Sequence, residues 1–244
     1  MKSLPLVFLL TLSIPAKSQK EESFYVFDAN WKATKIESAH FLLHTHMVND
    51  TCWQFEYYNF FGPIIKMEQY RDKEGNEING ISHHYNEKGL IDSTGNFRNG
   101  KRNGEFLKLT GNPLKYKWKY IYHDDSLIDV IDLENQKTES SESYKDEKES
   151  EYPGGLAGWK RYMLKNFKYP ERAMKGNVQG QVSVRFVVDK AGYVIDPYIS
   201  ASVEYSLDEE ALRIVMGSGK WEPAFQNGLN LKSYKMQPIN FRLE

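Results

Sequence analysis

Apolar and polar residues alternate over several short stretches of the chain, and this two-residue period is typical of half-buried β-strands. The alternation is regular in residues 180–189, and a polar turn at 189–192 leads into a second apolar-rich stretch at 193–203. In two other stretches, 156–167 and 207–215, large apolar residues recur every three or four positions, as in an amphipathic helix. The chain is therefore predicted to have an α+β fold, with antiparallel strands and helices.

The N-terminal half of the chain is predicted to consist of strands and tight turns. Residues 39–48 and 51–58 have the composition of two strands joined by the polar pair Asn49-Asp50. Asn-Gly pairs at 99–100 and 103–104 favour type I′ hairpin turns, because both central residues of such a turn need a positive φ.

Glycine and aromatic residues recur around these turns. Gly95, Gly100 and Gly104 frame Phe97 and Phe106. This spacing resembles a MORN-type repeat, a glycine-punctuated β-hairpin unit, with one clean copy here and a degraded one near 74–85. The resemblance implies a β-hairpin meander over residues 22–137.

Two segments are predicted to lie outside the folded domains. Residues 1–18 have a lysine, an apolar run and small residues before a cleavage site, so we expect a signal peptide cleaved after Ser18. The apolar run has about half of the roughly 20 residues that span a membrane, so an uncleaved inner-membrane anchor is the less favoured alternative. Residues 138–150 are rich in Glu and Ser and have no aliphatic side chain, which predicts an acidic disordered linker before a second domain at 151–244.

Charge and cysteine content exclude several classes of protein. The chain has 32 Lys and Arg against 33 Asp and Glu, so its net charge of −1 gives no field that would attract nucleic acid. One cysteine, Cys52, excludes an intramolecular disulfide framework and a cysteine-rich zinc site. No motif of a thiol nucleophile surrounds Cys52, so we interpret it as a small buried hydrophobe.

The histidines are the remaining candidates for chemistry. His40, His44 and His46 share strand parity and would point to one face, so a metal site is conceivable. The alternate positions are largely apolar, and we therefore favour the interpretation that the three histidines lie on the solvated face of a half-buried strand. We expect no metal, no cofactor and no enzymatic activity.

The second domain carries the most specific pattern. It resembles the C-terminal domain of TonB, in the form common in Bacteroidetes-like bacteria. The matching pieces, in order, are Tyr152-Pro153-Gly154-Gly155, Lys168-Tyr169-Pro170, Gly180-Gln181-Val182, Phe186-Val187-Val188, Gly192-Tyr193-Val194, Leu207-Asp208-Glu209-Glu210-Ala211-Leu212, Trp221-Glu222-Pro223 and Pro238-Ile239-Asn240-Phe241. From the residues alone, Ser206 to Glu209 is predicted to be a capping box.

The resemblance implies a small three-stranded antiparallel sheet with two helices on one face. It also implies a non-enzymatic domain that binds a short extended segment of outer-membrane receptors in TonB-dependent transport of nutrients or siderophores. The chain lacks the long proline-rich spacer of a full energy transducer, so we expect a periplasmic accessory or orphan member that touches membranes only through its partner. The alternative is an envelope scaffold that binds peptidoglycan or another periplasmic protein.

The last strand is the predicted binding site. Tyr234 and Met236 share one parity and Ile239 and Phe241 the other, which predicts a β-bulge at Pro238. Proline cannot donate a ladder hydrogen bond, so this strand is expected at the sheet edge, where an extended partner can add a strand. The resemblance points to the same strand and to the segment after α-helical residues 156–167. The predicted partner-binding residues are Tyr169, Pro170, Arg172, Lys232, Tyr234, Lys235, Met236 and Gln237. The alternative is that the strand only completes the sheet.

Overall fold

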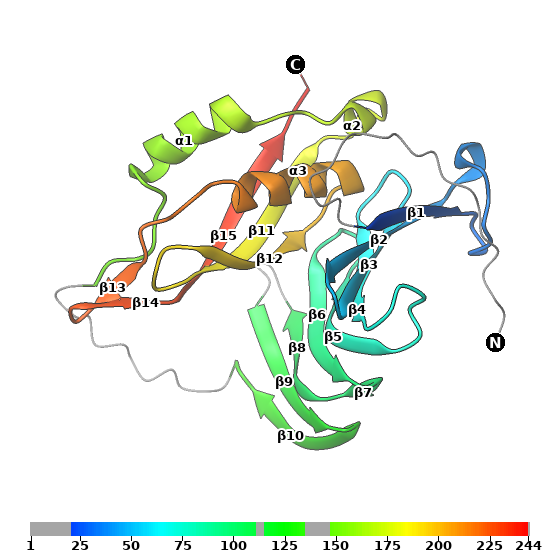
Figure 1. Cartoon of the computed structure of the whole chain (residues 1–244), viewed down its shortest axis with the longest axis horizontal. Coiled ribbons are helices and arrows are strands. Elements are labelled where there is room, and N and C mark those ends of the chain that lie inside the picture. Colours follow the sequence, from blue (N-terminus) through cyan, green and yellow to red (C-terminus); the bar gives the residue numbers. More distant parts are fainter. Residues whose placement is uncertain (1–20, 111–114, 135–146, 244) are drawn as a thin grey trace. The chain divides into compact units, whose positions relative to one another are not determined.

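The computed structural model describes residues 21–110, 115–134 and 147–243 (Figure 1). The predicted signal peptide and residues 138–146 of the predicted linker lie outside the described residues. The chain divides into two compact units, the first formed by residues up to 87 and 91–135, the second by 88–90 and 136–244. Each unit is described by itself.

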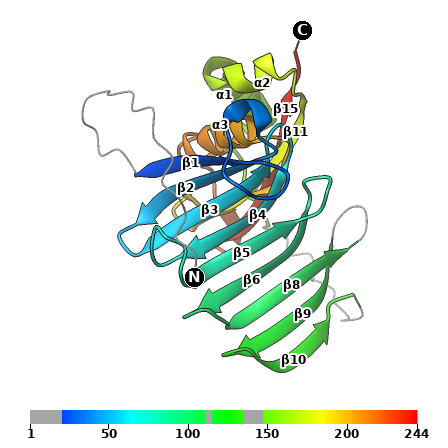
Figure 2. The same cartoon turned by 90° about the vertical axis from the view of Figure 1, so that its right-hand side faces the viewer.

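The first unit is an antiparallel β-meander of ten strands, in which nearly every strand pairs with the next one along the chain (Figure 2). The short β7 pairs with β6, which also pairs with β8. The strands are β1 (Glu22–Phe27), β2 (Phe41–Asn49), β3 (Cys52–Asn59), β4 (Ile64–Tyr70), β5 (Ile78–Tyr85), β6 (Ile91–Arg98), β7 (Lys101–Arg102), β8 (Gly104–Thr110), β9 (Lys115–His123) and β10 (Ser126–Asp132). A meander of hairpins is what the MORN resemblance implied, and it supports that resemblance at the level of strand content.

Turn chemistry explains where these strands reverse. Asn99 and Gly100 both have a positive φ, 52° and 77°, as the predicted type I′ turn requires. The second predicted I′ turn is wrong, because of its two residues only Gly104 adopts a positive φ. That residue begins β8, which pairs with β6 as β7 does, so the chain continues along β6 with a shifted register instead of reversing.

Gly95 in β6 is required by an aromatic ring on a neighbouring strand. A Cβ added to Gly95 would lie 2.1 Å from ring atoms of Phe106. The ring of Phe106 in turn packs edge-on against Phe97, at 5.3 Å between centroids, and against Tyr122, at 5.2 Å. The glycine and the phenylalanines of the sequence pattern therefore form one packing unit.

We predict that Gly95→Ala lowers the free energy of unfolding of the first unit by about 2 kcal/mol, because the added methyl group displaces the Phe106 ring. Denaturation of the full chain followed by circular dichroism measures this loss. In a Phe106→Ala background the same substitution should have little further effect. An equal loss in both backgrounds would contradict the packing explanation.

The second unit is a three-stranded antiparallel sheet in the order β12-β11-β15, with helices and a hairpin attached. This agrees with the predicted α+β class and with the implied sheet. The described residues of this unit form three helices, however, where the resemblance implied two. The elements are α1 (Gly155–Asn166), α2 (Glu171–Lys175), β11 (Gly180–Val188), β12 (Val194–Ala201), α3 (Tyr205–Met216), β13 (Ala224–Gln226), β14 (Leu229–Leu231) and β15 (Ser233–Phe241).

The core of this unit lies between the sheet and α3, which packs against all three strands. The inward residues of β11 are those of the predicted alternation, Val182, Val184, Phe186 and Val188, and each is almost fully buried. Trp221 closes the core beside Trp159 of α1, and its indole N–H donates to the Ser218 hydroxyl at 2.9 Å. The predicted stripe of α1 is correct for Trp159 but wrong for Leu156, which is exposed.

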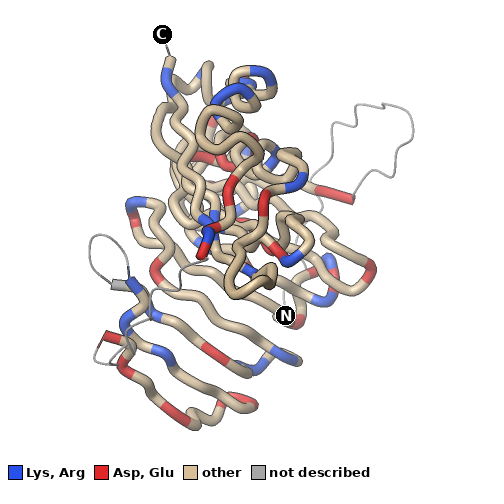
Figure 3. The backbone as a smooth tube through the Cα atoms, turned by 90° about the vertical axis from the view of Figure 1, so that its left-hand side faces the viewer, with Lys and Arg blue, Asp and Glu red and all other residues tan. Residues whose placement is uncertain are grey.

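Basic and acidic residues are interspersed along the described parts of both units (Figure 3). Many of them form ion pairs across neighbouring strands, such as Lys119 with Glu105 and Lys108 with Asp92. The near-zero net charge of the chain is therefore accompanied by the pairing of opposite charges on neighbouring strands.

Candidate partner-binding site

The last strand, β15, lies at an edge of the C-terminal sheet (Figure 1). Its neighbour is β11, and no other strand of the described residues pairs with it. This confirms the prediction of an edge strand. The N–H and C=O groups that point away from β11 are therefore available to another extended chain.

The predicted β-bulge at Pro238 is wrong. The pairing of β11 with β15 runs without a shift from Gly180–Phe241 to Val188–Ser233, and Pro238 simply lies opposite Ser183. Ile239 and Phe241 face the core and are buried, so by alternation Tyr234 and Met236 must face outward. The apolar residues change parity along the strand because they lie on different faces. Tyr234 and Met236 are on the outer face of the first half, and Ile239 and Phe241 are on the inner face of the second half.

Tyr234 and Met236 make the outer face of β15 apolar. Their side chains are 88% and 56% exposed. Tyr234 lies opposite Val187, and Met236 lies opposite Arg185. The first half of β15 therefore offers a large aromatic and a flexible thioether side chain beside an unpaired backbone edge.

The inner side of this half-strand is held by residues from the end of the predicted linker. Lys235 Nζ lies 3.3 Å from a Glu149 carboxylate oxygen, and the hydroxyls of Ser233 and Ser150 are 2.6 Å apart. The backbones of Lys148 and Phe225 form a bridge. The described contacts of the second unit thus include residues before Glu151, the residue at which the sequence predicted the second domain to begin.

Lys148 forms two ion pairs that hold the end of the predicted linker against the second unit. Its ammonium group contacts the carboxylates of Glu222 at 2.5 Å and Glu151 at 2.9 Å. The hydrogen bonds that the ammonium group donates to these two carboxylates, the one to Glu222 first, raise the pKa of Lys148. The backbone of Glu151 also pairs with that of Glu222, so the acidic segment ends as a short strand-like piece against the hairpin β13–β14.

The other predicted binding residues are used inside the fold. The Tyr169 hydroxyl donates to the Val178 carbonyl at 2.6 Å, and burial raises its pKa. The ring of Tyr169 packs edge-on against Phe241 at 5.9 Å, and Pro170 occupies the N-cap position of α2. These residues therefore lie at the Phe241 end of β15, about 17 Å along the strand from Met236.

Arg172 pairs with a carboxylate at the centre of the unit. Its Nε–H donates to Glu204 at 2.5 Å, and the Glu204 side chain is fully buried. Glu204 is also the N-cap of α3, since it accepts from the Ser206 backbone N–H at 2.8 Å. The predicted capping box at Ser206 is therefore wrong: the cap is two residues earlier, and Asp208 instead binds Ser202 and the Val203 N–H. A glutamate N-cap was not expected from the sequence, because Glu is not among the residues preferred at this position.

The structure does not gather the eight predicted residues into one site. Lys232 to Gln237 follow the open edge of β15, whereas Tyr169, Pro170 and Arg172 stabilise the opposite end of the strand and the start of α3. The candidate site is therefore the first half of β15.

Residues 165–243 match the protein family described as Gram-negative bacterial TonB protein C-terminal. This part of the chain is a TonB C-terminal domain. The match begins within α1 and extends through β15, so it covers the whole three-stranded sheet of the domain and α3. Neither a curated protein nor a solved structure matches the chain.

The TonB domain sets the general class of function. Domains of this family are non-enzymatic, transport-associated and periplasmic, and they interact with outer-membrane TonB-dependent receptors. The match supports a TonB-like energy-transduction or envelope protein. None of the helices in the described residues is long and apolar enough to span a membrane.

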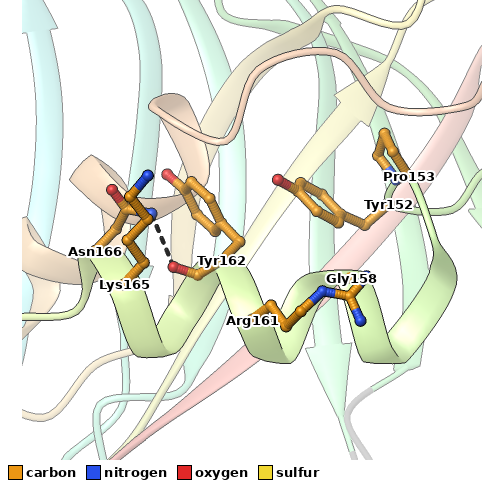
Figure 4. Close-up of a pocket in the computed structure, with 7 residues that line it drawn as sticks. All are labelled: Tyr152, Pro153, Gly158, Arg161, Tyr162, Lys165 and Asn166. Atoms are coloured by element: carbon orange, nitrogen blue, oxygen red, sulfur yellow. Dashed lines mark hydrogen bonds between the residues drawn. The ribbon is translucent and has the colours of Figure 1, made fainter.

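A shallow groove of about 510 Å³ runs along α1, mostly before the matched part of the TonB domain (Figure 4). Tyr152 and Tyr162 lie on one side and Arg161 and Lys165 are exposed beside them. Gly158 lets α1 approach the preceding loop, because a Cβ there would lie 2.0 Å from the Pro153 carbonyl oxygen. This groove was not predicted from the sequence, in which Tyr152-Pro153-Gly154-Gly155 served only as a piece of the family resemblance.

The N-terminal unit holds the remaining candidates. His40 is exposed and His46 half-buried, but His44 is buried, so the predicted solvated histidine face is wrong for that residue. Burial opposes ionisation of the neighbouring Glu56, yet the hydrogen bond from His44 and the nearby His46 hold the Glu56 pKa below its usual value. Cys52 is half-buried rather than buried, and burial raises its pKa, which disfavours the reactive thiolate.

We predict that Arg172→Leu destabilises the full chain by about 3 kcal/mol, because it leaves the Glu204 carboxylate buried without its cation. Chemical denaturation measures the loss. Adding Glu204→Gln to this variant should recover much of it, whereas the exposed Lys232→Ala should change stability little. Unchanged stability in Arg172→Leu would contradict this structural role, and Arg172 would again be a candidate for partner binding.

Proposed function

We propose that the chain is a periplasmic partner-binding protein whose TonB domain engages an outer-membrane TonB-dependent receptor or a related envelope protein. The observation that supports this proposal is the open edge of β15, with Tyr234 and Met236 exposed beside it. In this proposal an extended segment of the partner adds as a fourth strand to the sheet.

The two edges of the sheet differ in their fitness for strand addition. β12 is irregular: its pairing with β11 shifts twice, Asp196 has a positive φ of 51°, and Pro197 lacks an N–H. β15 keeps one register throughout, and its only proline, Pro238, lies beyond the exposed half. The stretch from Ser233 to Gln237 is therefore the better template for an added strand.

The side chains of this stretch suit a partner segment that has both apolar and polar residues. Tyrosine supplies a large contact area with little conformational freedom to lose, and methionine adapts to different neighbours. Lys232, exposed just before the strand, adds a positive charge, as Lys235 does beside Glu149. Gln237 is half-buried at the end of the stretch. Specificity in this proposal comes from Lys232, Tyr234, Lys235, Met236 and Gln237, without Tyr169 and Arg172.

The cellular role proposed for this domain is accessory. With a signal peptide cleaved after Ser18, as the sequence predicts, the protein would act in the periplasm without its own membrane anchor. It would then bind components of TonB-dependent transport of nutrients or siderophores without itself transmitting force from the inner membrane.

We predict that Tyr234→Ser weakens binding of a peptide from the periplasmic N-terminal segment of an outer-membrane TonB-dependent receptor by about tenfold, because a central aromatic contact is lost. Isothermal titration with the full chain measures this affinity. The matched control is Tyr193→Ser, which removes an exposed tyrosine next to the β12 edge and should leave the affinity unchanged. Equal affinities in both variants would exclude the β15 edge.

One observation favours a second function, an envelope scaffold that binds peptidoglycan. The groove along α1 places two tyrosines next to Arg161 and Lys165, which suits sugar rings and carboxylates of cell-wall fragments (Figure 4). If purified sacculi retain the wild-type chain but not Arg161→Ala, while receptor peptides bind neither, the scaffold function replaces the favoured one.

A further inference from the structure

A buried histidine on β2 lies between two carboxylates of the neighbouring strands. His44 Nδ1 is 2.9 Å from a Glu56 oxygen on β3, and His44 Nε2 is 3.3 Å from a Glu22 oxygen on β1. The His46 ring stacks on the His44 ring at 4.8 Å between centroids. Three strands thus bring two imidazoles and two carboxylates to one face of the sheet.

The strand register explains this arrangement. His44 and His46 have the same parity on β2, so their side chains point to the same face. Glu56 lies directly opposite His44, and Glu22 lies directly opposite His46. The sequence alone shows the histidines but not their partners. Glu56 is 12 positions from His44, and Glu22 is 24 positions from His46, so these pairs appear only when the strands are aligned.

We propose that His44, His46 and Glu56 form a binding site for a Zn²⁺ ion. One nitrogen or oxygen atom from each of these side chains lies within 4.8 Å of the others. Tetrahedral zinc with bonds of about 2.0 Å holds its ligand atoms about 3.3 Å apart, so side-chain shifts of about 1 Å are enough to form the site. Imidazole nitrogen and carboxylate oxygen are ligands that zinc accepts, whereas Ca²⁺ and Mg²⁺ prefer oxygen alone.

Two further side chains are placed to orient these ligands. With His44 Nδ1 on the metal, its Nε2–H donates to Glu22, as metal-bound histidines commonly donate to a carboxylate. Gln54 donates to the second oxygen of Glu56 at 2.8 Å and so fixes the carboxylate plane. The remaining coordination position is left for water, which can enter on the side of half-buried His46 and exposed Glu22.

Zinc at this place would connect β2 to β3 and, through Glu22, to the edge strand β1. The buried His44 and Glu56 would then exchange one hydrogen bond for two metal bonds. The expected consequence is a first unit that is more stable with Zn²⁺ than without it, because a ligand bound only by the folded state stabilises that state.

Isothermal titration of the metal-free full chain with ZnCl₂ tests the proposal. We expect one Zn²⁺ per chain and a raised melting temperature, with the affinity reduced at least about 100-fold in His46→Asn and in Glu56→Gln. The matched control is His40→Asn, which replaces an exposed histidine of the same parity and should bind like the wild type.

Co²⁺ gives a second readout that needs no variant, because cobalt in a tetrahedral site absorbs strongly in visible light. Saturation at one Co²⁺ per chain, with displacement by Zn²⁺, supports the site even if Glu56→Gln fails to fold. Absence of Zn²⁺ binding by the wild type overturns the proposal, and so does binding that survives in folded His46→Asn.

Discussion

The uninterrupted pairing of β15 with β11 is the constraint on which the C-terminal unit depends. It brings Ile239 and Phe241 into the core beside Val182 and turns Tyr234 and Met236 outward. The same pairing leaves the other side of β15 without a partner strand in the described residues. The register between β11 and β15 thus determines which residues of β15 stabilise the core of the TonB domain and which are exposed at its edge. A shift by one residue would exchange the two faces and remove both properties.

Local patterns in the sequence were sufficient to predict most elements of the fold. The alternation in β11, the Asn99-Gly100 turn and the helical spacing around Trp159 each depend on residues that are near one another in sequence. Two of the errors, at the start of α3 and in β15, occurred where contacts distant in sequence determine the structure. Glu204 caps α3 because Arg172 neutralises it, and the apolar change in β15 needs no bulge because the outer face of the strand is open.

The candidate site could be predicted only in part, for the same reason. The edge position of β15 followed from Pro238, a local signal, and is confirmed. The roles of Tyr169 and Arg172 came from a family resemblance, which does not reveal that their polar groups bind Val178 and Glu204. The His44–Glu56 pair depends on strand alignment, and the docking of Lys148 onto Glu222 joins residues 74 apart. Such contacts become visible only in three dimensions.

The proposed function requires that the first half of β15 receives an extended partner strand. Amide hydrogen exchange of the full chain, measured with and without a saturating receptor peptide, tests it at the level of the backbone. We expect added protection at Ser233 to Gln237, because N–H groups on the open side of the strand gain acceptors, and no added protection in β12. Protection confined to β12 or to α1, with β15 unchanged, would contradict it.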